Sequence, residues 1–350
     1  MNLKPSLNWL LVFIPVSIFG EVARIEVLAF VGASLAIIPL SGLIGEATEE
    51  LAYHVGPRLG GLLNATFGNL TELIVASLLV LDNQFDVAKA SLTGSIIGNL
   101  LLVLGLAFVV GGVGRSEQRF SARSAAVHSA SLVLAVVALL MPAILRLTSP
   151  HVSDQHIEVL SALVAGVLVI SYVATIAFTQ VTHTHLFGGH EASGEPSWTR
   201  RRAIIVLLAA AIAVGVESEF LVSSLQPALG ALHLPTLFVG LIVIPIIGNA
   251  AEHSSAVIFA VRNRMNITLE IAIGSSSQVA LFVAPAVIFI SLVLGHPMNF
   301  VFTAFEIVTV ALATLIVTVV CADGRSNWLE GAQLLGTYVI IAAAAFFVSG

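Results

Sequence analysis

The chain has 350 residues, of which 58% are hydrophobic and 10% are charged. Soluble domains carry about 25% charged residues, so lipid must cover much of this surface, and we expect an all-α integral membrane protein in a lipid bilayer. The net charge of −6, without a long basic run, gives no indication of a nucleic-acid partner. The single cysteine, Cys321, excludes an internal disulfide and a cysteine-based zinc site.

Apolar runs predict about eleven membrane-spanning helices, because a bilayer core needs about 20 apolar residues per helix. Their approximate bounds are 6–20, 25–46, 62–82, 90–113, 124–147, 157–180, 202–225, 235–261, 268–294, 300–321 and 328–348. The first run also resembles a signal-peptide core, but no clear cleavage site follows it, so we expect it to be retained. The predicted organisation is an extra N-terminal helix (1–24), a first half (25–181), a cytoplasmic linker (182–201) and a second half (202–350).

Basic residues sort to one side of the predicted membrane. With the N-terminus in the cytoplasm, eleven of the 14 Lys and Arg residues fall in cytoplasmic segments, and only Arg24, Lys89 and Arg146 fall outside. Since cytoplasmic loops carry an excess of Lys and Arg, this bias predicts a cytoplasmic N-terminus.

A short motif repeats at a fixed offset. Gly68, Asn69, Glu72 and Ala76 recur 180 positions later as Gly248, Asn249, Glu252 and Ala256, and Gly94-Ser95 recurs as Gly274-Ser275. Predicted spans two to six therefore match spans seven to eleven. Because five is an odd number, the second copy enters the membrane from the opposite side. Inverted repeats are a transporter architecture, with the substrate near the midplane. A duplicated membrane enzyme or structural protein is the alternative.

Two carboxylates lie inside predicted spans. Glu72 lies about halfway along the third span, and Glu252 lies somewhat past the middle of the eighth. A carboxylate at bilayer depth costs several kcal/mol unless it is paired, protonated or bound to a cation. No Lys or Arg lies in the middle of a predicted span, so we expect exchangeable partners, either a metal ion or protons.

Polar side chains accompany each of these carboxylates. Asn69 and Glu72 are three residues apart and share a helix face, and Asn249 and Glu252 repeat the arrangement. The preceding glycines and Pro245 weaken the helix there, so backbone carbonyls also become available to a cation. The predicted supporting ligands on the next helix of each half are Ser95 and Asn99, and Ser275 and Gln278.

The predicted donor set consists of oxygens. Such a set suits Ca²⁺, which accepts about six to eight oxygens at irregular geometry, whereas zinc would favour His or Cys. His253 follows Glu252 but points about 100° away on a helix, so we expect a proton or packing role for it. Two close carboxylates without a cation cannot easily both stay ionised. Protons would therefore compete with the metal, and competition at a site that opens to each side in turn is exchange.

The motifs and their surroundings resemble a known family. "GNLTELIVAS" and "GNAAEHSSAV", with "GLIGEATEELAYHVGPRLGGLLNATFGN" before the first and "GSSSQVALFVAP" after the second, closely resemble the Ca²⁺/H⁺ antiporters of the cation/proton exchanger family, within the calcium/cation antiporter superfamily. The resemblance covers nearly the whole chain. It implies eleven helices, four of them forming a central diamond, and Ca²⁺ bound between Glu72 and Glu252 with Asn69 and Asn249 beside them. The short N-terminal segment implies a prokaryotic member in the plasma membrane.

Further acidic residues lie near the ends of predicted spans. Glu46, Glu49 and Glu50 share a helix face at the cytoplasmic end of the second span, where they could gather Ca²⁺ or act as a gate. The alternative is a solvated helix end. Glu217 and Glu219 lie towards the outer end of the seventh span and could act at the outer mouth.

Other features argue against a catalytic protein. We found no His-Glu-x-x-His motif and no phosphate-binding glycine loop, so neither a membrane metalloprotease nor an ATP-driven pump is indicated. We expect a transporter that is not an enzyme and has no cofactor. Glu306, near the outer end of the tenth span, is expected to be an interfacial charge. The resulting hypothesis is a transporter that exchanges Ca²⁺ for H⁺ and exports cytoplasmic calcium, with a homo-oligomer as an option. The alternatives are a Na⁺-coupled Ca²⁺ exchanger and a divalent cation channel, although a channel needs no inverted repeat.

Overall fold

The computed structural model describes residues 7–183 and 196–348. Within these residues the regular secondary structure is helical apart from one antiparallel pair of short strands, β1 (Gln118–Arg119) and β2 (Arg325–Ser326). The all-helical fold class predicted from composition is confirmed. The predicted linker 182–201 and the predicted first segment 1–24 lie partly outside the described residues.

The described N-terminal half contains eight α-helices and three shorter helical segments of other types. In chain order they are the 3-10 helix η1 (Leu7–Val12), α1 (Phe13–Ala23), α2 (Glu26–Val55), α3 (Pro57–Phe67), α4 (Leu70–Leu81), α5 (Phe85–Ile97), the π-helical η2 (Gly98–Val103), α6 (Leu104–Gly112), α7 (Ala122–Thr148), α8 (Asp154–Ala177) and the π-helical η3 (Phe178–Thr182).

The described C-terminal half alternates α-helical and π-helical segments before two long final helices. In chain order they are α9 (Arg200–Leu232), α10 (Thr236–Phe238), η5 (Val239–Val243), α11 (Ile244–Gly248), α12 (Ala250–Val261), α13 (Met265–Leu269), η6 (Glu270–Gly274), α14 (Ser275–Gln278), η7 (Val279–Val283), α15 (Ala284–Val293), α16 (Ala304–Val320) and α17 (Trp328–Phe347); the η segments are π-helical.

Many of the helices are suited to lipid. Among the described residues, 7 continuous stretches are long and apolar enough to cross a membrane, and one bent pair, Thr236–Gly248 with Ala250–Val261, passes the same test together. Three shorter apolar helices accompany them: Leu7–Ala23, Leu70–Leu81 and Ala304–Val320. Large apolar side chains point outward, such as Val293 with 85% of its surface exposed. The chain is therefore a multi-pass membrane protein.

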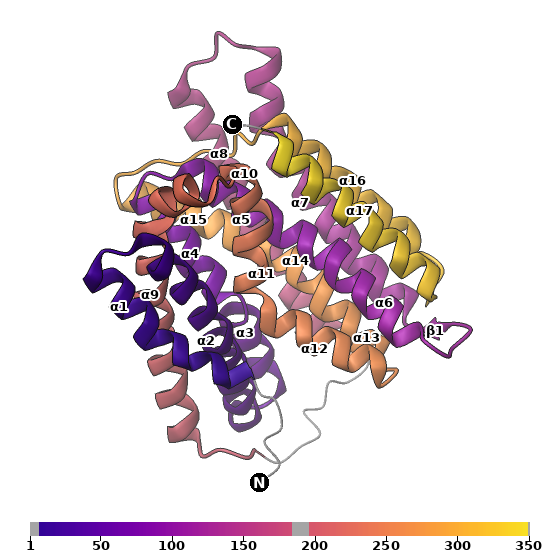
Figure 1. The fold of residues 1–350 in the computed structure, drawn as a ribbon. Coiled ribbons are helices and arrows are strands. Elements are labelled where there is room, and N and C mark those ends of the chain that lie inside the picture. The colour runs from indigo at the N-terminus through magenta and orange to yellow at the C-terminus, as the bar shows by residue number, and fades with distance from the viewer. Residues whose placement is uncertain (1–6, 184–195, 349–350) are drawn as a thin grey trace.

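The helices form three groups (Figure 1). One side of the molecule holds α1, α2, α3 and α9, and the opposite side holds α6, α7, α16 and α17. Between them lie α4, α5, α11, α12, α14 and α15. The long helices α2 and α9 come from different halves of the sequence and pack against each other. The two halves are therefore interleaved in the fold.

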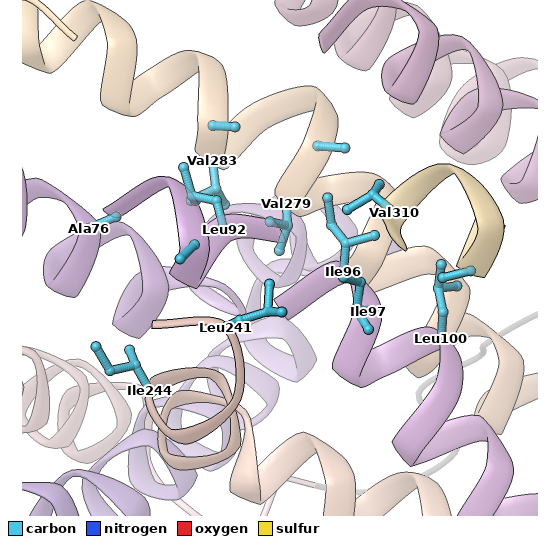
Figure 2. Packing of buried hydrophobic residues seen from close by; sticks show 14 of the residues in the cluster. Ala76, Leu92, Ile96, Ile97, Leu100, Leu241, Ile244, Val279, Val283 and Val310 are labelled. Atoms are coloured by element: carbon cyan, nitrogen blue, oxygen red, sulfur yellow. The ribbon is translucent and has the colours of Figure 1, made fainter. Parts of the chain in front are cut away.

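The apolar core joins both halves in the central group. Figure 2 shows Leu92 and Ile96 of α5 beside Leu241 of η5 and Val279 and Val283 of η7. Leu241 and Val279 are fully buried, and Leu92 and Ile96 are nearly so. Burying each such side chain contributes about 1.5–3 kcal/mol. Apolar contacts between the halves therefore help to hold the central helices in place.

One close helix crossing in this core requires a glycine. A Cβ at Gly94 of α5 would lie 2.2 Å from the backbone oxygen of Leu241 and 2.6 Å from Cγ of Pro245. Small residues allow helix backbones to approach in this way. At Gly98, one turn later, such a Cβ would meet nothing within 4 Å.

Two charged residues are more buried than the sequence predicts. Lys89, which the charge count places in an outside loop, lies in α5 with 9% of its surface exposed, and its Nζ donates to Oδ1 of Asn299 at 3.1 Å. The prediction of an interfacial charge at Glu306 is wrong, because its side chain is only 2% exposed. The carboxylate accepts bonds of 2.8 Å from the backbone N–H and the hydroxyl of Thr303 and a longer one from Thr93, which satisfy it inside the protein.

The strands β1 and β2 tie together two connections at one end of the molecule. Gln118 pairs with Ser326, and Arg119 pairs with Arg325. The carboxylate of Glu117 forms ion pairs with Arg119 and Arg325. The hydrogen bond from Arg119, together with the charges of both guanidinium groups, holds the pKa of Glu117 below its usual value. The end of α16 is thereby kept next to the start of α7.

We predict that Gly94→Ala destabilises the protein by about 1–3 kcal/mol, because the added methyl group forces the backbones of α5 and η5 apart. Gly98→Ala is the matched control, since its methyl group meets open space. The measurement is the midpoint of thermal unfolding of both purified variants in detergent. Equal midpoints for the two variants would contradict the close crossing.

Candidate functional site

Two broken helices form the centre of the candidate site. The first break lies at Gly68 and Asn69, between α3 and α4, and the second lies at Asn249, between α11 and α12. The two asparagines have nearly the same backbone angles, φ −102° and ψ 25° for Asn69 and φ −99° and ψ 6° for Asn249. The second break bends the chain by 62°. The weakening of the helix predicted from the Gly-Asn pairs is therefore confirmed in both copies.

The breaks place both glutamates at the start of a helix. Glu72 lies in the first turn of α4, and Glu252 lies in the first turn of α12. A helix N-terminus carries unpaired N–H groups and a partial positive charge, which stabilises a nearby anion by about 0.3–1 kcal/mol at an exposed position and more in a partly buried one. Each carboxylate therefore gains electrostatic support from its own helix without needing a basic side chain.

The hydroxyl group of Ser275 is the hub of the polar cluster. Its Oγ lies 2.9 Å from Oε2 of Glu252 and 3.2 Å from Oδ1 of Asn69, and it can donate its one proton to either oxygen. It also accepts a bond of 3.3 Å from Nδ2 of Asn99. The serine therefore links one carboxylate to two amides of the other half of the chain.

Two further hydrogen bonds cross between the halves. Nδ2 of Asn69 donates to Oε1 of Gln278 at 2.7 Å, and Nδ2 of Asn249 donates to Oγ of Ser95 at 3.2 Å. Because the amide N–H groups donate these bonds, the amide oxygens of the two asparagines remain available to accept a hydrogen bond or to bind a cation. Oδ1 of Asn249 has no hydrogen-bond partner within the described part of the chain.

The two carboxylates lie close together in this cluster. Glu72 is 8% exposed, Glu252 is partly buried, and the charge of Glu252 acts on Glu72. Oε2 of Glu72 is buried and has no hydrogen-bond partner among the described residues. The ion pairs recorded over residues 7–183 and 196–348 involve Glu117 and Asp154, and neither site glutamate takes part in one. When these carboxylates are ionised, they therefore have no fixed counter-charge within the described part of the chain.

A small cavity adjoins Glu72. Its polar lining comes from Glu72, Ser91 and Ser95, and its apolar lining includes Ile37 of α2 and Leu221 of α9. Sequence reasoning missed Ser91. It lies four residues before Ser95, on the same face of α5, and this spacing was the available signal. The cavity connects the site to the packed pair α2 and α9.

The acidic residues predicted at the cytoplasmic mouth lie outside the cluster. Glu46 and Glu49 are exposed, and Glu49 accepts a bond from the hydroxyl of Tyr53. Glu50 is buried and accepts a bond of 2.9 Å from the backbone N–H of Trp198. The prediction that these acids end their helix is wrong, since α2 continues to Val55. Glu50 instead attaches the segment before α9 to α2.

The remaining predicted residues are also separate from the hydrogen-bond cluster. Glu217 on α9 is buried, and its Oε2 has no hydrogen-bond partner among the described residues, whereas Glu219 is exposed. His253 follows Glu252 in α12, is partly buried, and its Nε2 has no hydrogen-bond partner in the described residues. The roles suggested for these three residues stay predictions.

Comparison with known proteins identifies the family. The model of the family described as sodium/calcium exchanger protein matches residues 25–180 and 202–347. The chain belongs to the sodium/calcium exchanger protein family. The sequence is 45% identical to a Ca²⁺/H⁺ antiporter of Aphanothece halophytica over 97% of this chain and 95% of the relative. It is 39% identical to the Ca²⁺/H⁺ antiporter ChaA of Bacillus subtilis over 96% of this chain and 97% of the relative.

Solved exchanger structures share the fold. The native YfkE structure superimposes with a TM-score of 0.86 at 36% identity, covering 98% of this chain and all of that one. An H⁺/Ca²⁺ exchanger named CAX superimposes with a TM-score of 0.76 at 16% identity, covering 98% of this chain and 92% of that one. The sodium/calcium exchanger fold therefore extends over nearly the whole described chain.

Proposed function

We propose that this protein is a secondary active transporter that exchanges Ca²⁺ for H⁺ and exports cytoplasmic calcium. The observation that carries the proposal is the pair Glu72 and Glu252, which lie at the two helix breaks. Their charges interact with each other, and neither forms an ion pair in the described residues. Buried charges of one sign are stable only with a bound counter-ion or after protonation. The relatives named Ca²⁺/H⁺ antiporter support the same substrates.

The chemistry of the cluster favours Ca²⁺ as the transported metal. The proposed ligands are the carboxylates of Glu72 and Glu252 and the amide oxygens of Asn69 and Asn249. Ser95, Asn99, Ser275 and Gln278 support them through the hydrogen bonds described above. Hard cations such as Ca²⁺ prefer oxygen ligands at variable geometry. The cluster uses no cysteine, and Ca²⁺ enters as substrate rather than as a cofactor.

Protons are proposed to take the place of the metal. When Ca²⁺ leaves, two neighbouring carboxylates repel each other, and protonation removes the repulsion. The hydroxyl group of Ser275 can then turn from Glu252 to Asn69, since both acceptors lie within 3.2 Å. One set of side chains therefore serves both ions, which makes their binding mutually exclusive and couples their movement.

The proposed architecture is eleven helices, with two inverted repeats of five and one extra N-terminal helix. The separate family matches at 25–180 and 202–347, and the equivalent breaks at Asn69 and Asn249, support it. Hydrogen bonds of the site run between the halves, so a movement of one half against the other would open the site to one side. This is the proposed basis of alternating access.

The proposed orientation has the N-terminus in the cytoplasm of a prokaryote, with the protein in the plasma membrane. The distribution of Lys and Arg supports it. Lys4, which belongs to that distribution, lies outside the described residues. In this orientation the connection carrying β1, and that between α12 and α13, face the cytoplasm.

We predict that Glu72→Gln and Glu252→Gln each abolish Ca²⁺ uptake driven by an acidic interior in everted vesicles. Glutamine keeps the size of the side chain but can neither carry the negative charge nor exchange a proton. The measurement is radioactive Ca²⁺ uptake with an imposed pH gradient, with and without Na⁺. Uptake by either variant at the parent rate would contradict the assignment, and uptake driven by Na⁺ alone would favour a Na⁺-coupled exchanger.

We predict that Ser275→Ala raises the Ca²⁺ concentration for half-maximal uptake by about tenfold, which corresponds to about 1.4 kcal/mol. The substitution removes the hydroxyl that joins Glu252, Asn69 and Asn99. Ser276→Ala is the control, because the Ser276 hydroxyl donates to the carbonyl of Ala272 in its own helix at 2.8 Å. Equal half-saturation values for the two variants would argue against the role of Ser275.

A further inference from the structure

A row of polar side chains extends along α5 and into η2. Ser91, Ser95 and Asn99 are spaced four residues apart, so each lies about one helical turn from the next on a shared face. All three are buried. Ser95 and Asn99 take part in the hydrogen bonds of the cation cluster. Ser91 continues the row by one turn beyond Ser95, towards the start of α5.

The hydroxyl group of Ser91 can still accept a cation. It donates its one proton to the backbone carbonyl of Ala88 at 2.8 Å, and a hydroxyl oxygen carries two further lone pairs. Ser91, Ser95 and Glu72 line the same small cavity. Oε2 of Glu72 is buried and has no hydrogen-bond partner over residues 7–183 and 196–348. A cation in this cavity therefore meets a carboxylate oxygen and a serine oxygen that need not give up other bonds.

The cavity lies on the outer side of the two helix breaks in the proposed orientation. Val75 follows Glu72 in α4, which runs outward from the first break. Ile244 and Pro245 precede the second break, in a stretch that enters the membrane from the outside. The described lining includes neither Glu252 nor any residue of α3 or α12, which lie on the cytoplasmic side of the breaks. The cavity therefore joins Glu72, and not Glu252, to the outer part of the molecule.

The polar row is not repeated in the second half of the chain. At the offset of 180 that relates the two motifs, Ser95 corresponds to Ser275, but Ser91 corresponds to Ile271. Ile271 is partly buried and packs against the apolar core. In an inverted repeat, the position equivalent to Ser91 would serve the opposite side of the membrane. A hydroxyl at this position is therefore a feature of the outer side alone.

A basic residue beside the row points away from the cavity. Lys89 precedes Ser91 by two residues, which is about 200° around the helix. Its ammonium group donates to Oδ1 of Asn299 at 3.1 Å and to the backbone carbonyl of Val301 at 2.9 Å. The described lining of the cavity contains no lysine or arginine. No basic side chain of this lining therefore repels a cation next to Ser91 and Glu72.

We propose that Ser91 is a further cation ligand, which forms with Glu72 an outer position for Ca²⁺ between the central cluster and the outside. During export, Ca²⁺ leaves the oxygens of Glu252 and the asparagines and is held at the outer position before it regains its full water shell. Because Ca²⁺ accepts about six to eight oxygens at variable geometry, it can exchange them one at a time. The inference rests on the proposed Ca²⁺/H⁺ exchange and its orientation.

The test compares the two faces of the membrane in the exchange of radioactive for unlabelled Ca²⁺ at equal pH on both sides. Right-side-out vesicles present the outer face to the bath, and everted vesicles present the cytoplasmic face. Ser91→Ala is expected to raise the Ca²⁺ concentration for half-maximal exchange about fivefold at the outer face, because the outer position loses an oxygen. At the cytoplasmic face the value is expected to stay at that of the parent.

Ser224→Ala is the matched control for this substitution. Ser224 is a buried serine of α9 whose hydroxyl also donates to a carbonyl of its own helix, that of Phe220, but it does not line the cavity. This variant is expected to follow the parent at both faces. A half-saturation value of Ser91→Ala equal to that of the parent at the outer face would overturn the inference. An equal rise at both faces, which indicates general structural damage, would do so as well.

A second variant tests the outer position by a gain of metal binding. Ser91→Cys places a thiol, a ligand that zinc prefers, beside the carboxylate of Glu72. Zn²⁺ added to right-side-out vesicles is expected to inhibit Ca²⁺ exchange by this variant at a concentration about tenfold lower than for the parent. Equal sensitivity of variant and parent would overturn the inference and leave the proposed function in place. A parent that exchanges Ca²⁺ for Na⁺ instead of protons would contradict the proposed function alone, and a parent that carries no Ca²⁺ would overturn both.

Discussion

The repulsion between two neighbouring carboxylates is the constraint on which the rest of this structure depends. Glu72 and Glu252 lie close enough for their charges to interact, and no ion pair to either is recorded over residues 7–183 and 196–348. A lysine or arginine beside them would neutralise the proposed cation site permanently. The fold stabilises the charge through weaker and reversible interactions with two helix N-termini, one serine hydroxyl and amide groups.

These interactions require an unusual arrangement of helices. Two helices break so that their N-termini lie at the site, and α5 approaches η5 closely, which Gly94 permits. The crossing bonds Asn69–Gln278 and Asn249–Ser95 join the halves through polar contacts that water or ions can replace. The apolar contacts around Leu92 and Val279 supply the permanent attraction. The same interface therefore combines apolar packing with a few polar contacts.

The sequence predicts the helical membrane fold and the members of the central cluster because both depend on strong local signals. Apolar runs identify helices, and Glu72 and Glu252 are conspicuous as acids within them. Whether the other charged side chains are buried depends on hydrogen-bond partners that lie far away in the sequence. The buried Glu306 accepts a hydrogen bond from Thr93, over two hundred positions earlier in the chain. The buried Glu50 accepts one from Trp198. Such contacts follow from tertiary packing, which spacing along the chain does not reveal.

The central claim is that Ca²⁺ and protons compete for the same two carboxylates. Its most direct test is calorimetric titration of the purified protein with Ca²⁺ in buffers of different ionisation heat, which counts the protons released per ion bound. The account predicts that binding releases protons, that affinity falls as the pH is lowered from about 8 to about 6, and that Glu252→Gln reduces the release. Ca²⁺ binding of constant affinity over this range, without proton release, would contradict the account.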